Sequence, residues 1–186
     1  MIEISAETIE RVETLLTGVP KGAKRALSNA MNQGLSKIRT RAAKKVREVY
    51  TVQSSAINKA TNTKIQKISM GDLAGFISFA GYKIPLYKFK VTPKAPGIKK
   101  QVTATVKKGG GTPFEHAFIA QMKNGHIGVF ERETSKHFPI EEKMGLAMAQ
   151  MVGNLNVMTE LEKEAQKTVD ERVVYEIDRL LNSYGG

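Results

Sequence analysis

Three histidines are the residues of this chain best suited to act as bases or metal ligands: His116, His126 and His137. Their spacing matches no helical metal-binding motif, and the chain has no cysteine that could complete a zinc site. Ordinary positions in a sheet or at a subunit contact explain them better. We therefore predict no metal site.

Four glutamates lie close together in the sequence: Glu131, Glu133, Glu141 and Glu142. Without a nucleophile, base or metal beside them, they indicate surface charge or a subunit interface. The run Gly109–Thr112 has the glycines of a phosphate-binding loop but lacks the Lys-Ser/Thr pair that must follow them. We predict that the protein is not an enzyme and has no catalytic or cofactor-binding residues.

Charge is the strongest physical anomaly of the sequence. The formal net charge is +11, and it is unevenly distributed. Residues 1–20 carry −3, residues 21–110 carry +18 and residues 111–186 carry −4. A basic middle between mildly acidic ends indicates an anionic partner, either nucleic acid or an acidic protein surface.

Much of this positive charge falls on a predicted long helix over residues 21–49. Apolar residues recur there every three or four positions, which places them on one face: Ala23, Leu27, Ala30, Met31, Gly34, Leu35, Ile38, Ala42, Val46 and Val49. Five basic residues away from that stripe are the candidate interaction residues: Arg39, Arg41, Lys44, Lys45 and Arg47. They predict either a contact with nucleic acid or an acidic neighbouring subunit, or simply a solvated helix face.

Sequence-specific recognition of nucleic acid is not expected. The basic segment contains aromatic residues that could in principle stack bases, but they match no known signature. By the period of two in a strand, Phe76 and Phe79 fall on opposite faces and make no common platform. A non-specific, basic nucleic-acid-binding module remains the alternative hypothesis.

Periodicity predicts an α+β fold with a long N-terminal helix, a central antiparallel β-sheet with a hairpin, and a long C-terminal helix. A short helix over 5–16 begins at Ser5, with Glu7 near the positive end of the helix dipole. The sheet is expected between about 64 and 133, with alternation around Leu73–Ala80 and Gln101–Val106.

The turn and the closing helix complete this prediction. Asn124-Gly125 predicts a two-residue hairpin turn with positive φ at both positions. The last helix, over 155–182, carries an apolar stripe: Met158, Leu161, Ala165, Val169, Val173, Ile177, Leu180 and Tyr184. We expect one domain over 1–186, with a helical part at 1–62, the sheet at 63–138 and a C-terminal helical part at 139–186.

No export or membrane signal is evident. No stretch approaches the roughly 18 consecutive apolar residues that span a bilayer, and the first residues lack the pattern of a signal peptide. We expect assembly in the cytoplasm and no membrane partner.

The hairpin region resembles a known family. The run Phe114–Arg132, with the letters FEHAFIAQMKNGHIGVFER, is similar to the phage and prophage minor tail protein Z family. The similarity extends upstream through Gly81–Phe89 and Val102–Gly109, and downstream through Phe138–Glu142. One departure is Met144–Ala147, where such proteins usually continue with a Tyr-Gly-Pro-Ser-like run.

The resemblance implies a structural component of a tailed-bacteriophage virion. Such a minor tail protein would complete the head-proximal end of the tail and join it to the head at the neck. Its implied partners are other copies of itself in a homo-oligomeric ring, the tail tube or tail terminator, and head–neck proteins. Since tails in general have six-fold symmetry, we expect a hexamer. The resemblance implies no catalytic residues.

Overall fold

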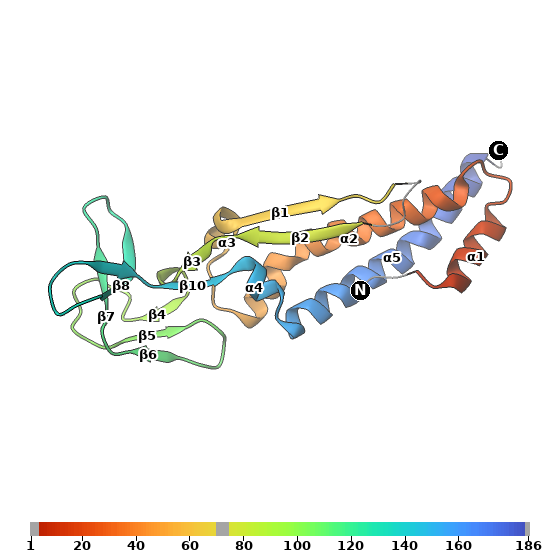
Figure 1. The fold of residues 1–186 in the computed structure, drawn as a ribbon. Helices are drawn as coiled ribbons and strands as arrows, with labels where there is room; N and C mark the ends of the chain where they lie inside the picture. The colour runs from red at the N-terminus through yellow and green to blue at the C-terminus, as the bar shows by residue number, and fades with distance from the viewer. Residues whose placement is uncertain (1–3, 70–74, 185–186) are drawn as a thin grey trace. The chain divides into compact units, whose positions relative to one another are not determined.

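Two long helices, α2 (Gly22–Val49) and α5 (Leu155–Tyr184), are the largest elements of the structure (Figure 1). The structure is a computed structural model that describes residues 4–69 and 75–184. Both helices confirm the prediction, because apolar residues spaced three and four apart return to one buried face. No helix among these residues is both long and apolar enough to cross a membrane.

The predicted apolar faces are largely correct. Every residue of the α2 stripe is buried or half-buried. On α5 the prediction is wrong at Met158, which is exposed, while Val157 is buried. The reason is that the residue four positions before Leu161 lies on the buried face of the helix, and the residue three positions before it does not.

A short first helix, α1 (Ala6–Leu15), confirms the helix predicted over 5–16. Ser5 caps it, since its side chain accepts a hydrogen bond from the backbone N–H of Thr8 at 3.2 Å. Glu7 lies in the first turn, as expected from the helix dipole. Two further short helices are α3 (Ser54–Ala60) and α4 (Met148–Val152).

The strands form four small sheets rather than one. They are β1 (Thr61–Gln66) with β2 (Phe76–Gly81); β3 (Lys83–Pro85) with β10 (Met144–Ala147); β4 (Lys90–Thr92), β5 (Val102–Thr105) and β6 (Thr112–Phe114); and β7 (Ala117–Gln121), β8 (Ile127–Arg132) and β9 (Ile140–Glu142). The last three sheets are antiparallel. A one-turn 3₁₀ helix, η1 (Leu86–Lys88), follows β3. The α+β class is confirmed.

The limits of the β region differ from the prediction. β1 begins inside the segment predicted to be helical up to residue 62, and β9 and β10 lie in the segment predicted to be helical from residue 139. These strands are short, and β10 pairs with residues about 60 positions earlier, with Met144 opposite Pro85. Local periodicity cannot report such a pairing, because it depends on tertiary contacts.

The β2 region confirms the expected alternation where the structure describes it. Ile77 and Phe79 are half-buried, whereas Phe76 and Ser78 are exposed, so the two phenylalanines lie on opposite faces. The predicted strand residues Leu73 and Ala74 lie outside the described residues.

The β7–β8 hairpin is confirmed, but the turn type predicted for it is wrong. Gly125 has a φ of 81°, whereas the only described non-glycine residue with positive φ is Lys21. Gly125 N–H donates to the carbonyl of Met122 at 2.9 Å, and Met122 N–H donates to the carbonyl of His126 at 2.7 Å. The loop therefore has three residues, with a glycine in the left-handed region after a tight turn. Asn124 contributes through its side chain, which accepts from His126 N–H at 3.0 Å.

The chain folds into two compact units. Unit 1 comprises Met1–Ala42, Thr63–Ser78 and Leu155–Gly186, and unit 2 comprises Ala43–Asn62 and Phe79–Asn154. The main core cluster of unit 1 joins α1, α2 and α5 through Val12, Leu16, Val19, Ala26, Leu27, Ala30, Val169, Val173, Ile177 and Leu180. Unit 2 buries large apolar side chains that include Ile57, Ile84, Leu86, Phe89, Val102, Val129, Met148 and Met151. That residues 1–186 act as one domain stays a prediction.

Polar contacts set the register inside unit 1. The Asn32 amide donates to the carbonyl of Ile68 at 2.8 Å and accepts from Ile68 N–H at 2.9 Å, so one side chain holds both backbone groups. Glu176, a buried carboxylate, accepts from Asn29 at 3.0 Å and from Arg179 at 2.6 Å. Because a buried charge is costly unless it is paired, these bonds favour one alignment of α2 with α5.

Candidate functional site

The five basic residues predicted on α2 do not share one environment. Arg39, Lys44 and Arg47 are exposed. Arg41 Nε lies 3.7 Å from Glu164 Oε2, and Lys45 Nζ lies 3.4 Å from Glu48 Oε2. The Lys45 side chain is only 13% exposed. Two of the five thus pair with carboxylates of this chain, and three present their charge to the surroundings.

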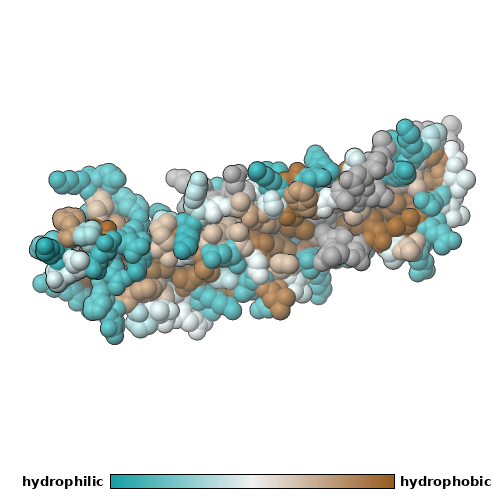
Figure 2. Space-filling model, viewed as in Figure 1, coloured by the Kyte–Doolittle hydropathy of each residue, from teal (hydrophilic) through white to brown (hydrophobic). Residues whose placement is uncertain are grey.

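The fold concentrates the positive charge on unit 2. This unit has 16 basic and 6 acidic residues, a net charge of +10, whereas unit 1 has 13 and 12, a net charge of +1. Among the side chains of unit 2 that the structure describes, twelve cations are exposed: Lys44, Arg47, Lys83, Lys90, Lys94, Lys99, Lys100, Lys107, Lys108, Lys123, Arg132 and Lys136. Hydrophilic residues cover much of the visible surface over β4 to β8 (Figure 2). Unit 2 is therefore the part of the molecule best suited to an anionic partner.

A basic loop at residues 94–100 is held in place at two points. Tyr87 Oη donates to the carbonyl of Lys94 at 3.1 Å, and Gly97 N–H donates to the carbonyl of Ile119 at 3.4 Å. Gly97 has a φ of 79°, which favours glycine. The loop presents Ile98, which is 46% exposed, among Lys94, Lys99 and Lys100. The prolines and the glycine of residues 91–98 are typical of a loop, but they do not reveal the two hydrogen bonds that hold it.

The glutamates near the hairpin form ion pairs across β8 and β9. Glu131 and Glu141 lie directly opposite each other, and Lys143 Nζ lies 2.5 Å from Glu131 and 3.8 Å from Glu141. The hydrogen bond from Lys143 lowers the pKa of Glu131 below its ordinary value, and the same bond raises the pKa of Lys143. One ammonium thus offsets the repulsion of two opposed carboxylates.

We predict a pH-dependent effect of Lys143→Gln. The contribution of Glu131 is present above its unfolded pKa and is lost as pH falls through its lowered folded pKa, while that of Lys143 is lost as pH rises through its raised pKa. At pH 7 the variant should therefore melt at a lower temperature than the wild type. This difference in melting temperature should become smaller below about pH 4. Lys136→Gln, at an exposed lysine nearby, is the control; an equal difference at all pH values would contradict the prediction.

The three histidines are not brought together. His116 and His137 are exposed, and His126 Nε2 lies 2.8 Å from Glu142 Oε1. Among residues 4–69 and 75–184, no group of three or more His, Cys, Asp or Glu side chains is arranged to hold a metal ion.

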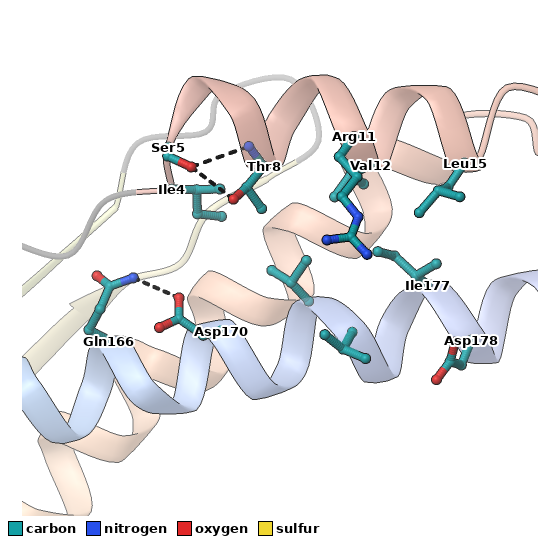
Figure 3. A pocket seen from close by; sticks show the side chains of 12 residues that line it. Ile4, Ser5, Thr8, Arg11, Val12, Leu15, Gln166, Asp170, Ile177 and Asp178 are labelled. Carbon is teal, nitrogen blue, oxygen red and sulfur yellow. Dashed lines mark hydrogen bonds between the residues drawn. The ribbon is translucent and has the colours of Figure 1, made fainter.

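Unit 1 has a groove between α1 and α5 that the sequence does not predict. Its volume is about 500 Å³, and it is lined by Ile4, Ser5, Thr8, Arg11, Val12, Leu15, Gln166, Asp170, Val173, Val174, Ile177 and Asp178 (Figure 3). Volumes of this size are typical of binding sites. Its signal in the sequence was Val174, an apolar residue of the last helix outside the predicted stripe.

Comparison with known proteins identifies the family. The profile of the family described as prophage minor tail protein Z (GPZ) matches residues 2–184 of the 186. The chain belongs to this family. Comparison of this chain with curated proteins and with solved structures gives no match. Membership confirms the resemblance carried by the hairpin, and it makes the protein a structural component of a phage tail and thus of the virion.

Proposed function

We propose that the protein completes the head-proximal end of the tail and joins the tail to the head, as a ring of identical copies with six-fold symmetry. Its neighbours there are the tail tube or tail terminator on one side and head–neck proteins on the other, and it carries out no catalysis. Membership of the minor tail protein Z family is the observation that carries this proposal.

The physical properties of the two units support a ring. A closed ring of identical chains needs two different surfaces that meet on neighbouring copies. The chain has two compact units of unlike charge, +10 and +1. Unit 1 also exposes apolar side chains, among them Leu15, Val174, Tyr175 and Leu181, that a neighbour would cover.

The test removes the gene from the phage and examines the particles. We expect filled heads and separate tails, because the junction would be incomplete, and supplying the protein in trans should restore joined particles. Electron microscopy of labelled protein should place it at the head-proximal end of the tail. Normal joining without the protein, or label at the distal end, would show that the proposal is wrong.

Contact with phage DNA is the second candidate function, favoured by the net charge of unit 2. Phosphate contacts through exposed lysines are independent of sequence and weaken steeply with salt. Binding of the purified protein to duplex DNA should then fall by orders of magnitude between about 50 and 200 mM salt. A protein that assembles on tails but does not bind DNA at low salt would leave only the structural role.

The exposed cations of α2 are expected to act in assembly rather than in folding. We predict that Arg39→Gln/Lys44→Gln/Arg47→Gln leaves the melting temperature unchanged but lowers incorporation into tails, since glutamine keeps helix propensity and much of the aliphatic stem. Arg41→Gln/Lys45→Gln is the matched control, because those cations already pair within the chain. Unchanged infectivity of the triple variant in a complementation assay would identify these residues as a solvated helix face.

A further inference from the structure

The α1/α5 groove places an apolar side chain between two acidic ones. Asp170, Val174 and Asp178 follow one another at intervals of four residues and therefore lie on one side of α5. Val174 is 60% exposed. The two aspartates stand about 12 Å apart along the helix, at 1.5 Å per residue. An apolar group flanked by cations would complement this arrangement.

The charge of the groove is net negative. Its lining contains two aspartates and a single arginine, Arg11, which extends from α1 toward α5 (Figure 3). Asp170 accepts a hydrogen bond from Gln166 at 2.9 Å, and Asp178 makes no hydrogen bond or ion pair with any described residue. The nearby Lys167 pairs with Glu171 at 3.8 Å and so adds no net charge.

The basic loop of unit 2 has the complementary features. Ile98 is an exposed apolar side chain with Lys94, Lys99 and Lys100 around it. Seven residues can span at most about 25 Å when extended, so lysines of one loop can reach both aspartates. Because Tyr87 and Ile119 already tether the loop, little conformational entropy is lost when it docks.

We propose that the basic loop of one copy docks into the α1/α5 groove of the next copy, with Ile98 against Val174 and the lysines beside Asp170 and Asp178. This inference rests on the proposed ring. The two surfaces differ, so the contact is heterologous, and its repetition around a rotation axis closes a ring without a further interface.

Disulfide cross-linking tests the contact, since the chain has no cysteine of its own. Phages carry Ile98→Cys, Val174→Cys or both substitutions, each at an exposed position. After oxidation of purified particles, the double variant should give a ladder of covalent multimers. Particles that contain a mixture of the two single variants should give dimers only. A disulfide forms only when the two Cα atoms lie within about 7 Å, so a ladder reports this contact directly.

The outcomes separate this inference from the proposed function. Labelled protein at the head-proximal end without a ladder would overturn the docking and leave the tail-completion role intact. Dimers of Val174→Cys alone, which indicate a symmetric contact, would also overturn it. Absence of the protein from tails would overturn both.

Charge reversal gives a second, independent measurement. Asp170→Lys/Asp178→Lys and Lys99→Glu/Lys100→Glu should each abolish incorporation into tails when supplied alone. A mixture of the two should restore it, because each reversed surface meets its complement on the other variant. Failure of the mixture, with both variants folded by circular dichroism, would contradict the contact.

Discussion

Leu180→Ala is expected to lower the free energy of unfolding by about 3 kcal/mol, as is typical when a buried leucine leaves a cavity. Leu180 is 1% exposed and belongs to the core cluster that joins α5 to α1 and α2. Because this cluster also holds α1 beside α5, the α1/α5 groove should lose its shape in the same variant. Denaturant unfolding of the purified chain measures the change.

The neighbouring leucine provides a matched control. Leu181 has the same side chain in the same helix but is 39% exposed. We expect Leu181→Ala to change stability by less than about 1 kcal/mol, since little area is removed from the core. Equal losses in the two variants would mean that the burial of α5 is not as described.

Gly145→Ala is expected to destabilise unit 2 by about 1–3 kcal/mol, because the added methyl group would overpack the core. A Cβ at this position would lie 2.5 Å from Cε2 of Phe89, a ring that is itself buried. Gly145 is part of β10, which pairs with β3, so the strain falls on a contact between distant parts of the chain. Thermal unfolding of the variant beside the wild type measures it.

The control for this substitution is Gly110→Ala. Apart from Gly110 and its two chain neighbours, no described residue has an atom within 4 Å of a Cβ added there. Alanine also restricts the unfolded chain, so we expect this variant to be neutral or more stable by up to about 1 kcal/mol. If Gly110→Ala lowered the stability as much as Gly145→Ala, the contact with Phe89 would not be the cause of the destabilisation.

Much of the fold follows from local patterns. The long helices appear in the sequence because a spacing of three and four residues produces a continuous apolar face, whatever that face packs against. Ser5 can also be predicted as a helix cap, because capping depends only on the residues next to it in the chain. Asn124-Gly125 predicts the position of the hairpin correctly. It does not predict the length of the loop, because two-residue and three-residue hairpin loops both accept asparagine and glycine.

The small sheets could not be assigned in this way. Met144 pairs with Pro85, and the Asn32 side chain holds the backbone of Ile68, across long intervals of sequence. Such partners are selected by tertiary packing and leave no period in the sequence. β9 and β10 therefore fell within a segment predicted to be helical.

The same division applies to the candidate site. The excess of positive charge, the lack of cysteine, the α+β class and the resemblance to the minor tail protein Z family can all be predicted from the order of the residues. The location of the charge, in contrast, depends on the packing of distant segments. α5 places its acidic residues in the same unit as the first part of α2, which leaves a net charge of +10 on unit 2. Tertiary packing also pairs Arg41 with Glu164, residues 123 positions apart, and brings α1 beside α5 to form the groove. The physical reason is that composition and periodicity are properties of neighbouring residues, whereas ion pairs and cavities depend on which distant segments pack together.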